Sequence, residues 1–116
     1  MKFMLTIIDD EPAQAALTAA ETEQMFATVG GIEKELQARK ILVDSRALRA
    51  SSQASTIRIL DGKAVVADGP FAETKEVLGG YFLIECASKA DAIEWAKRFP
   101  PVGSSAIEVR PIWEMS

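Results

Sequence analysis

The order of hydrophobic periodicities constrains the fold of this chain most. Apolar residues recur every three or four positions over residues 18–38 and 88–99, the spacing of amphipathic helices. Each helical stretch lies between short runs rich in β-branched and aromatic residues, at 2–8, 41–48, 81–86 and 106–113. The order strand, helix, strand, followed by strand, helix, strand, predicts helices packed on one face of an antiparallel sheet.

Two further short strands, residues 56–60 and 63–67, interrupt this pattern and are joined by Asp61-Gly62. Asp-Gly between β-rich runs is the strongest short hairpin signal, because both central residues of a type I′ turn need a positive φ. Without the insertion, the pattern is that of the ferredoxin-like βαββαβ fold. The sequence therefore predicts one α+β domain over residues 1–116, ferredoxin-like with an inserted β-hairpin.

Local signals sharpen the boundaries of these elements. Thr18 and Glu21 have the spacing of a capping box at the start of the first helix. Gly30 and Gly31 weaken that helix by roughly 1 kcal/mol each, and close packing onto the sheet would explain them. Pro111 predicts that the last strand lies at an edge or has a local break, because proline cannot donate a ladder hydrogen bond.

The first strand is followed by Asp9-Asp10-Glu11-Pro12. Pro12 is expected to end the strand, and an alanine-rich loop to follow it. The acids resemble a metal site only superficially, because consecutive side chains cannot all point inward. We therefore predict neither a metal ion nor a cofactor.

The strands at residues 3–8 and 81–84 are apolar on both faces. Helices on one side can cover only one face of the sheet, so the other face needs a second cover. We therefore expect a homodimer whose sheets pack face to face.

Composition limits the chemistry available to this chain, because it has no histidine. Ser-His and Cys-His nucleophile pairs are therefore excluded, together with the commonest zinc ligand. Acid–base chemistry would have to use carboxylates, lysine, Tyr81 or Cys86. As the single cysteine, Cys86 cannot form an internal disulfide, which favours a reducing compartment.

Net charge and hydropathy limit the kinds of partner that this chain can have. The net charge is −4 and no cluster of lysine or arginine forms a basic face, so we expect no direct nucleic-acid binding. No apolar run approaches the length of a membrane span, and the N-terminal residues lack the pattern of a signal peptide. We therefore expect a cytoplasmic protein without a membrane partner.

Turn formers and charges of both signs meet in Asp68-Gly69-Pro70-Phe71-Ala72-Glu73-Thr74-Lys75-Glu76, the stretch where we expect a site. Asp68 is the candidate catalytic residue, as a general base or a ligand-binding carboxylate. The alternative is that Asp68 accepts backbone N–H bonds within its own turn, as aspartate commonly does.

The candidate ligand-binding residues also have structural alternatives. Phe71 could form a wall of a ligand-binding site or pack into the core beneath the loop. Glu73 and Lys75 could line the entrance of a cleft or be exposed to solvent. Lys75 could then anchor an anionic ligand. Tyr81 could donate to a ligand or belong to an interface. The arginines Arg46 and Arg58 could face the same cleft or the solvent.

The same residues carry a resemblance that covers almost the whole chain. The motif Asp68-Gly69-Pro70-Phe71, the charges that follow it and Gly79-Gly80-Tyr81 resemble the YCII-related family, in its DGPF subgroup. Supporting stretches are residues 1–5, 90–96 and 108–111. The resemblance implies a dimeric α+β barrel of ferredoxin-like subunits. It also implies a regulatory or stress-linked role, because the subgroup is often encoded beside alternative sigma factors.

Three functions agree with these observations. The first is a dimeric α+β barrel that binds a small molecule beside Asp68, with or without cofactor-free acid–base chemistry assisted by Tyr81 or Lys75. The second is a non-catalytic regulatory or interaction module linked to a sigma factor. The third, a cofactor-free monooxygenase, rests on analogy between folds alone. The resemblance also implies enzymatic activity for the broader family, because some members carry a histidine–aspartate pair in a cleft. This sequence has no histidine, so that pair cannot be carried over, and whether the chain is an enzyme stays open.

Overall fold

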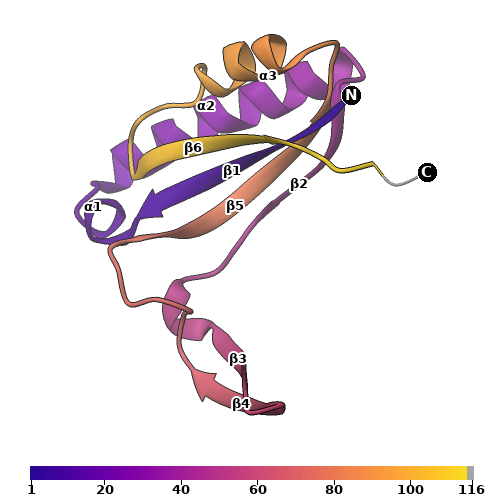
Figure 1. Cartoon of the computed structure of the whole chain (residues 1–116). Helices are drawn as coiled ribbons and strands as arrows, with labels where there is room; N and C mark the ends of the chain where they lie inside the picture. Colours follow the sequence, from indigo (N-terminus) through magenta and orange to yellow (C-terminus); the bar gives the residue numbers. More distant parts are fainter. Residues whose placement is uncertain (115–116) are drawn as a thin grey trace.

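A computed structural model describes residues 1–114 of the chain. Its centre is a four-stranded antiparallel sheet in the order β2-β5-β1-β6 (Figure 1). The central strands are β1 (Lys2–Asp10) and β5 (Glu76–Glu85), and the edge strands are β2 (Leu42–Ala47) and β6 (Ser104–Pro111). The predicted α+β class with an antiparallel sheet is confirmed, and Pro111 lies on an edge strand as expected.

Two helices connect the strands and pack on one face of the sheet (Figure 1). Helix α2 (Ala19–Ala38) joins β1 to β2, and α3 (Lys89–Ala96) joins β5 to β6. In each case, the two joined strands run parallel to each other and flank a third, antiparallel strand. This arrangement places both helices over the same side of the sheet.

The hydrophobic core lies between this sheet face and the helices. Along β1 the inward side chains alternate, so Phe3 and Leu5 are fully buried. The rings of Phe82 and Phe99 meet edge to face, with centroids 4.9 Å apart. The other buried core residues come from both helices and β5: Ile32, Leu36, Ile84, Ala92 and Trp95.

The first helical cap has the predicted form. The Thr18 hydroxyl accepts the backbone N–H of Glu21, and the Glu21 carboxylate accepts that of Thr18. The expected loop before it instead contains a short helix, α1 (Glu11–Ala15). Asp10 caps this helix, and Pro12 sits in its first turn, where a missing N–H costs nothing. The prediction treated Pro12 only as a strand breaker.

The inserted hairpin is present and stands apart from the main sheet. It consists of β3 (Ser55–Leu60) and β4 (Lys63–Asp68), preceded by a 3-10 helix (Ser51–Gln53). We call residues 55–68 the arm. Asp61 and Gly62 have φ of 51° and 76°, as a type I′ turn requires. Helices α2 and α3 lie at the top of Figure 1 and the arm at the bottom, with the sheet between them.

The sheet face opposite the helices has an apolar centre and charged edges. Because Phe3 and Leu5 point toward the helices, Met4, Thr6 and Ile8 point to this open face, and Leu83 pairs with Met4 there. The edge strands carry the ion pairs Arg46–Asp44 and Arg110–Glu108, each with an N–O distance of 2.7 Å. Within residues 1–114, no helix is long and apolar enough to cross a membrane.

Candidate functional site

Two irregularities of the sheet meet at the end of β1. Between β1 and β5 the register shifts after Ile7, which leaves Gly79 without a partner. Between β1 and β6 it shifts after Ile8, so that Asp9 pairs with Ser104. Such bulges bend a strand and re-aim its side chains, and they are common beside functional sites. Here, the two shifts lie on either side of Ile8, immediately before Asp9.

The Asp9 carboxylate lies directly over Gly79. A Cβ atom at position 79 would come within 1.8 Å of Asp9 Oδ2, so any larger residue would displace the carboxylate. The Ser104 hydroxyl donates to Asp9 Oδ1 at 3.3 Å, and the Gln14 side chain in α1 also donates to this carboxyl. Asp9 is therefore held from three elements: β5, β6 and α1.

Burial dominates the electrostatics of Asp9. The half-buried position removes water from the carboxyl and raises its pKa, and the negative charge of Glu11 adds to this effect. The hydrogen bonds from Gln14 and Ser104 favour the charged form and only partly offset the increase. A carboxyl with a raised pKa is better suited to exchange protons near neutral pH than an ordinary surface aspartate.

Asp9 faces a hollow of about 440 Å³ between α2 and the sheet, which we call the Asp9 cleft. Its walls are mainly apolar, and its polar groups include a second carboxylate, that of Glu33. The Ser45 hydroxyl donates to Glu33 Oε1 at 2.9 Å. The apolar lining comes from α2 and the inner sheet face: Ile7, Met25, Phe26, Val29 and Phe82.

Glycines shape this cleft. A Cβ atom at Gly30 would meet no atom within 4 Å, so the helix is open there rather than tightly packed on the sheet. The expectation that close packing explains Gly30 and Gly31 was therefore wrong. Gly80 does have a close neighbour, because a Cβ atom there would lie 2.6 Å from the Arg46 carbonyl oxygen. It allows β2 and β5 to approach.

The residues proposed from the sequence do not gather at the Asp9 cleft, apart from Arg46, which is part of its lining. Asp68 is exposed at the end of β4, and among residues 1–114 its carboxylate joins no hydrogen bond or ion pair. Arg58 stacks over Phe71 at 4.8 Å and donates to the Phe71 carbonyl oxygen at 3.0 Å. Glu73 and Lys75 are exposed in the segment between the arm and β5.

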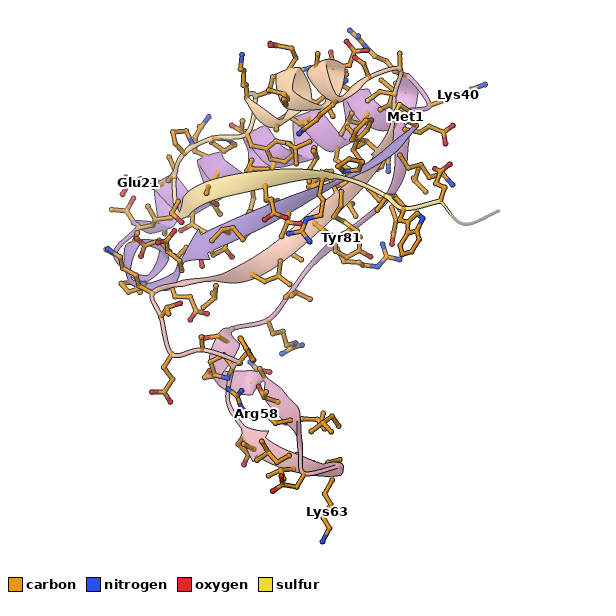
Figure 2. All side chains as sticks on the ribbon, viewed as in Figure 1. Met1, Glu21, Lys40, Arg58, Lys63 and Tyr81 are labelled. Atoms are coloured by element: carbon orange, nitrogen blue, oxygen red, sulfur yellow. The ribbon has the colours of Figure 1, made fainter. Side chains whose placement is uncertain are left out.

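Tyr81 and Arg46 meet elsewhere, at Asp44. The Tyr81 hydroxyl donates to Asp44 Oδ2 at 2.7 Å, and Arg46 pairs with the same carboxylate. This hydrogen bond raises the pKa of Tyr81 and lowers that of Asp44. Figure 2 shows Tyr81 on the sheet and Arg58 in the arm, in separate parts of the molecule.

A second hollow, of about 710 Å³, lies at the base of the arm. It is lined largely by apolar side chains, with Leu48 and Leu78 on the sheet side and Phe71 beside the arm. Phe71 therefore does line a hollow, but Asp68, Lys75, Tyr81 and the two arginines are not part of its lining.

Sequence reasoning missed Asp9, because three consecutive acids were considered together. The structure separates their roles. Asp9 faces the cleft, and Asp10 accepts the backbone N–H of Ala13. Glu11 accepts the backbone N–H of Ser51 at 2.9 Å. A signal was available in Gly79-Gly80, because two glycines early in a strand mark a bulge or a close approach. Among residues 1–114, no three acidic or cysteine side chains are grouped to hold a metal ion.

Comparison with known proteins places this chain in a family. The YCII-related domain matches residues 1–116. An uncharacterized protein of Rhizobium meliloti (strain 1021) is 34% identical over 117 residues, which cover 97% of this chain and 92% of the relative. With a match over its full length, the chain belongs to the YCII-related domain family.

Proposed function

We propose that this protein binds a small molecule in the Asp9 cleft. The observation that carries the proposal is a half-buried carboxylate, held by Ser104 and Gln14 beside two bulges, that lines a hollow. A volume of about 440 Å³ lies in the range of sites for small ligands, and a mainly apolar lining with few polar groups is typical of them.

Asp9 also supports a proposal of cofactor-free acid–base chemistry. With its raised pKa, the carboxyl can accept a proton from a bound molecule and return it. Asp9 replaces Asp68 as our first candidate for this role, because Asp68 is exposed and lines neither hollow. Asp68 stays a candidate only for a site that forms when another molecule covers the arm.

The assembly that we propose is a homodimer. The strand order β2-β5-β1-β6 with both helices on one face supports a ferredoxin-like subunit carrying an inserted hairpin. Its open face has an apolar centre bordered by ion pairs, which suits sheets packed face to face in a dimeric α+β barrel. The motif at residues 68–71 supports placing the chain in the DGPF subgroup.

A second candidate function is a regulatory or interaction module without catalysis, linked to an alternative sigma factor. The exposed apolar side chains of the arm favour an interaction role of this kind. Stable capture of a sigma factor by the wild-type protein, lost in a variant without the arm, would support it.

Neighbouring glycines give a matched test of the binding proposal. Gly30 lines the cleft, whereas Gly31 is exposed and does not line it, and both have open space around their Cα. Gly30→Leu should fill the cleft, and Gly31→Leu should not. Both changes should strengthen α2 by a similar amount, roughly 1 kcal/mol.

The measurement is a fragment screen by ligand-observed NMR on the wild type and both variants. We expect fragments that bind the wild type and Gly31→Leu but not Gly30→Leu. If every fragment that binds the wild type also binds Gly30→Leu, the Asp9 cleft is not the site and the proposal fails.

A further inference from the structure

The charged groups of the Asp9 cleft are unbalanced. Among the described residues that line it, Asp9 and Glu33 carry carboxylates, and Arg46 is the one basic residue, although its guanidinium pairs with Asp44 on the open face of the sheet. The Arg46 guanidinium is already engaged, because its Nη1 lies 2.7 Å from Asp44 Oδ1 and donates to the Ser45 carbonyl oxygen at 2.6 Å. The arginine side chain is also exposed. The cleft therefore offers negative charge without a matching cation.

The neutral donors of the cleft are engaged as well. The Ser104 hydroxyl and the Gln14 side chain donate to Asp9, and the Ser45 hydroxyl donates to Glu33. A carboxylate can accept about four hydrogen bonds, so both acids retain acceptor capacity. A ligand in the cleft can therefore donate hydrogen bonds to these two carboxylates. Few groups of the cleft are left to donate hydrogen bonds to acceptors on the ligand.

The rest of the wall suits an apolar body. Met25, Phe26 and Val29 from α2 face Phe82 and Ile7 from the sheet. Phe26 is two-thirds exposed in the single chain, so a ligand in the cleft would cover apolar surface that is otherwise in water.

We infer that the Asp9 cleft takes a cationic small molecule, an amine carried on an aryl or alkyl body, and discriminates against carboxylates and phosphates. This inference rests on the proposed binding function and adds the class of ligand. It reverses the expectation from the sequence, in which Lys75 would anchor an anion. The ammonium would donate to Asp9 and Glu33, while its body would lie against the α2 wall.

The test uses three probes that share an aryl group and differ in charge: 2-phenylethylamine, 2-phenylethanol and 3-phenylpropanoate. Their affinities are measured by chemical-shift titration of the labelled full chain near neutral pH, followed at cleft residues. We expect the amine to bind most tightly, and roughly tenfold or more tightly than the carboxylate, which is the effect of a charge-assisted hydrogen bond.

Three variants assign the effect to the cleft. Asp9→Asn and Glu33→Gln should each weaken amine binding several-fold and weaken binding of the alcohol much less, because a neutral hydroxyl gains less from a carboxylate than an ammonium does. Glu23→Gln removes the same charge from an exposed position on α2 and should change neither. An amine affinity that is unchanged in both cleft variants would overturn the inference.

The remaining outcomes separate the inference from the proposed function. Tighter or equal binding of 3-phenylpropanoate in the cleft would overturn the inference and leave small-molecule binding intact. The inference would also fail if none of the probes bound while fragments still depended on Gly30. If neither probes nor fragments occupied the cleft, the proposed function itself would fall.

Discussion

The body of the molecule and its arm are built from similar strands but differ in packing. In the body, β1 and β5 bury Phe3, Leu5 and Ile84 completely beneath two helices. In the arm, β3 and β4 pair with regular register, yet none of residues 55–68 is buried. The difference is a second layer of structure, which the body has and the arm lacks in the single chain.

This difference separates two contributions to structure. The turn at Asp61-Gly62 and the β-branched residues determine that the arm is a hairpin, but an isolated two-stranded hairpin is marginally stable in water. Ile57, Ile59 and Val66 share one of its faces, and each is exposed by more than half. Local sequence therefore specifies the conformation, whereas burial supplies the stability.

The largest effect should come from truncating isoleucine in the body. Ile32 on α2 is 4% exposed, and Ile32→Ala should cost about 2–5 kcal/mol, since a cavity adds to the lost apolar burial. Thermal unfolding should show a Tm at least about 8 °C lower. A change under about 2 °C would mean that the body is no better packed than the arm, and the comparison would fail.

A smaller effect of opposite sign is expected at the site. The folded pKa of Asp9 lies above the ordinary value of 3.8, so Asp9 contributes stability while protonated. This contribution is fully present below the unfolded pKa and is lost as pH rises through the folded pKa. Asp9→Asn, which stays neutral, should therefore raise the Tm near neutral pH by less than about 4 °C.

The pH dependence is the check on this prediction. The difference in Tm between Asp9→Asn and wild type should shrink as the pH falls through the raised folded pKa of Asp9, because the wild-type carboxyl then becomes protonated. Asp10→Asn is a poor control because Asp10 caps α1, so Glu23→Gln is used instead. A variant less stable than wild type at neutral pH would show that the Asp9 carboxylate stabilises the body.

The smallest effect should come from the same truncation in the arm. Ile59 is 70% exposed, and Ile59→Ala should change the stability of the dilute protein by less than about 0.5 kcal/mol. Unfolding is measured over a range of protein concentrations, because a partner copy that covers Ile59 would make the effect grow with concentration. A large loss at the lowest concentration would place Ile59 in a packed core.

The parts of the fold that were predictable rest on local signals. The order of strands and helices, the capping box at Thr18 and the hairpin turn at Asp61 each depend on residues close in sequence. The start of β5 was placed at Tyr81, whereas the strand begins at Glu76. Residues 76–78 are strand because they pair with the end of β1, and no local pattern encodes that pairing.

The site was harder to predict because distant segments form it. Asp9 and Ser104 are 95 positions apart in sequence, and they are brought together by a sheet with two bulges. The sequence drew attention to residues 68–76, which have a distinctive turn chemistry but line no part of the Asp9 cleft. Turn residues identify where a chain bends, whereas a site depends on where strands end.

The contact between Asp9 and Gly79 restricts the order in which substitutions can accumulate. Because a Cβ atom at position 79 would overlap the Asp9 carboxylate, alanine at 79 forces that carboxylate out of its position in the cleft. The same alanine meets no such obstacle once position 9 has become glycine. The two positions therefore depend on each other, and a lineage that keeps the Asp9 carboxylate in its present place is expected to keep glycine at 79.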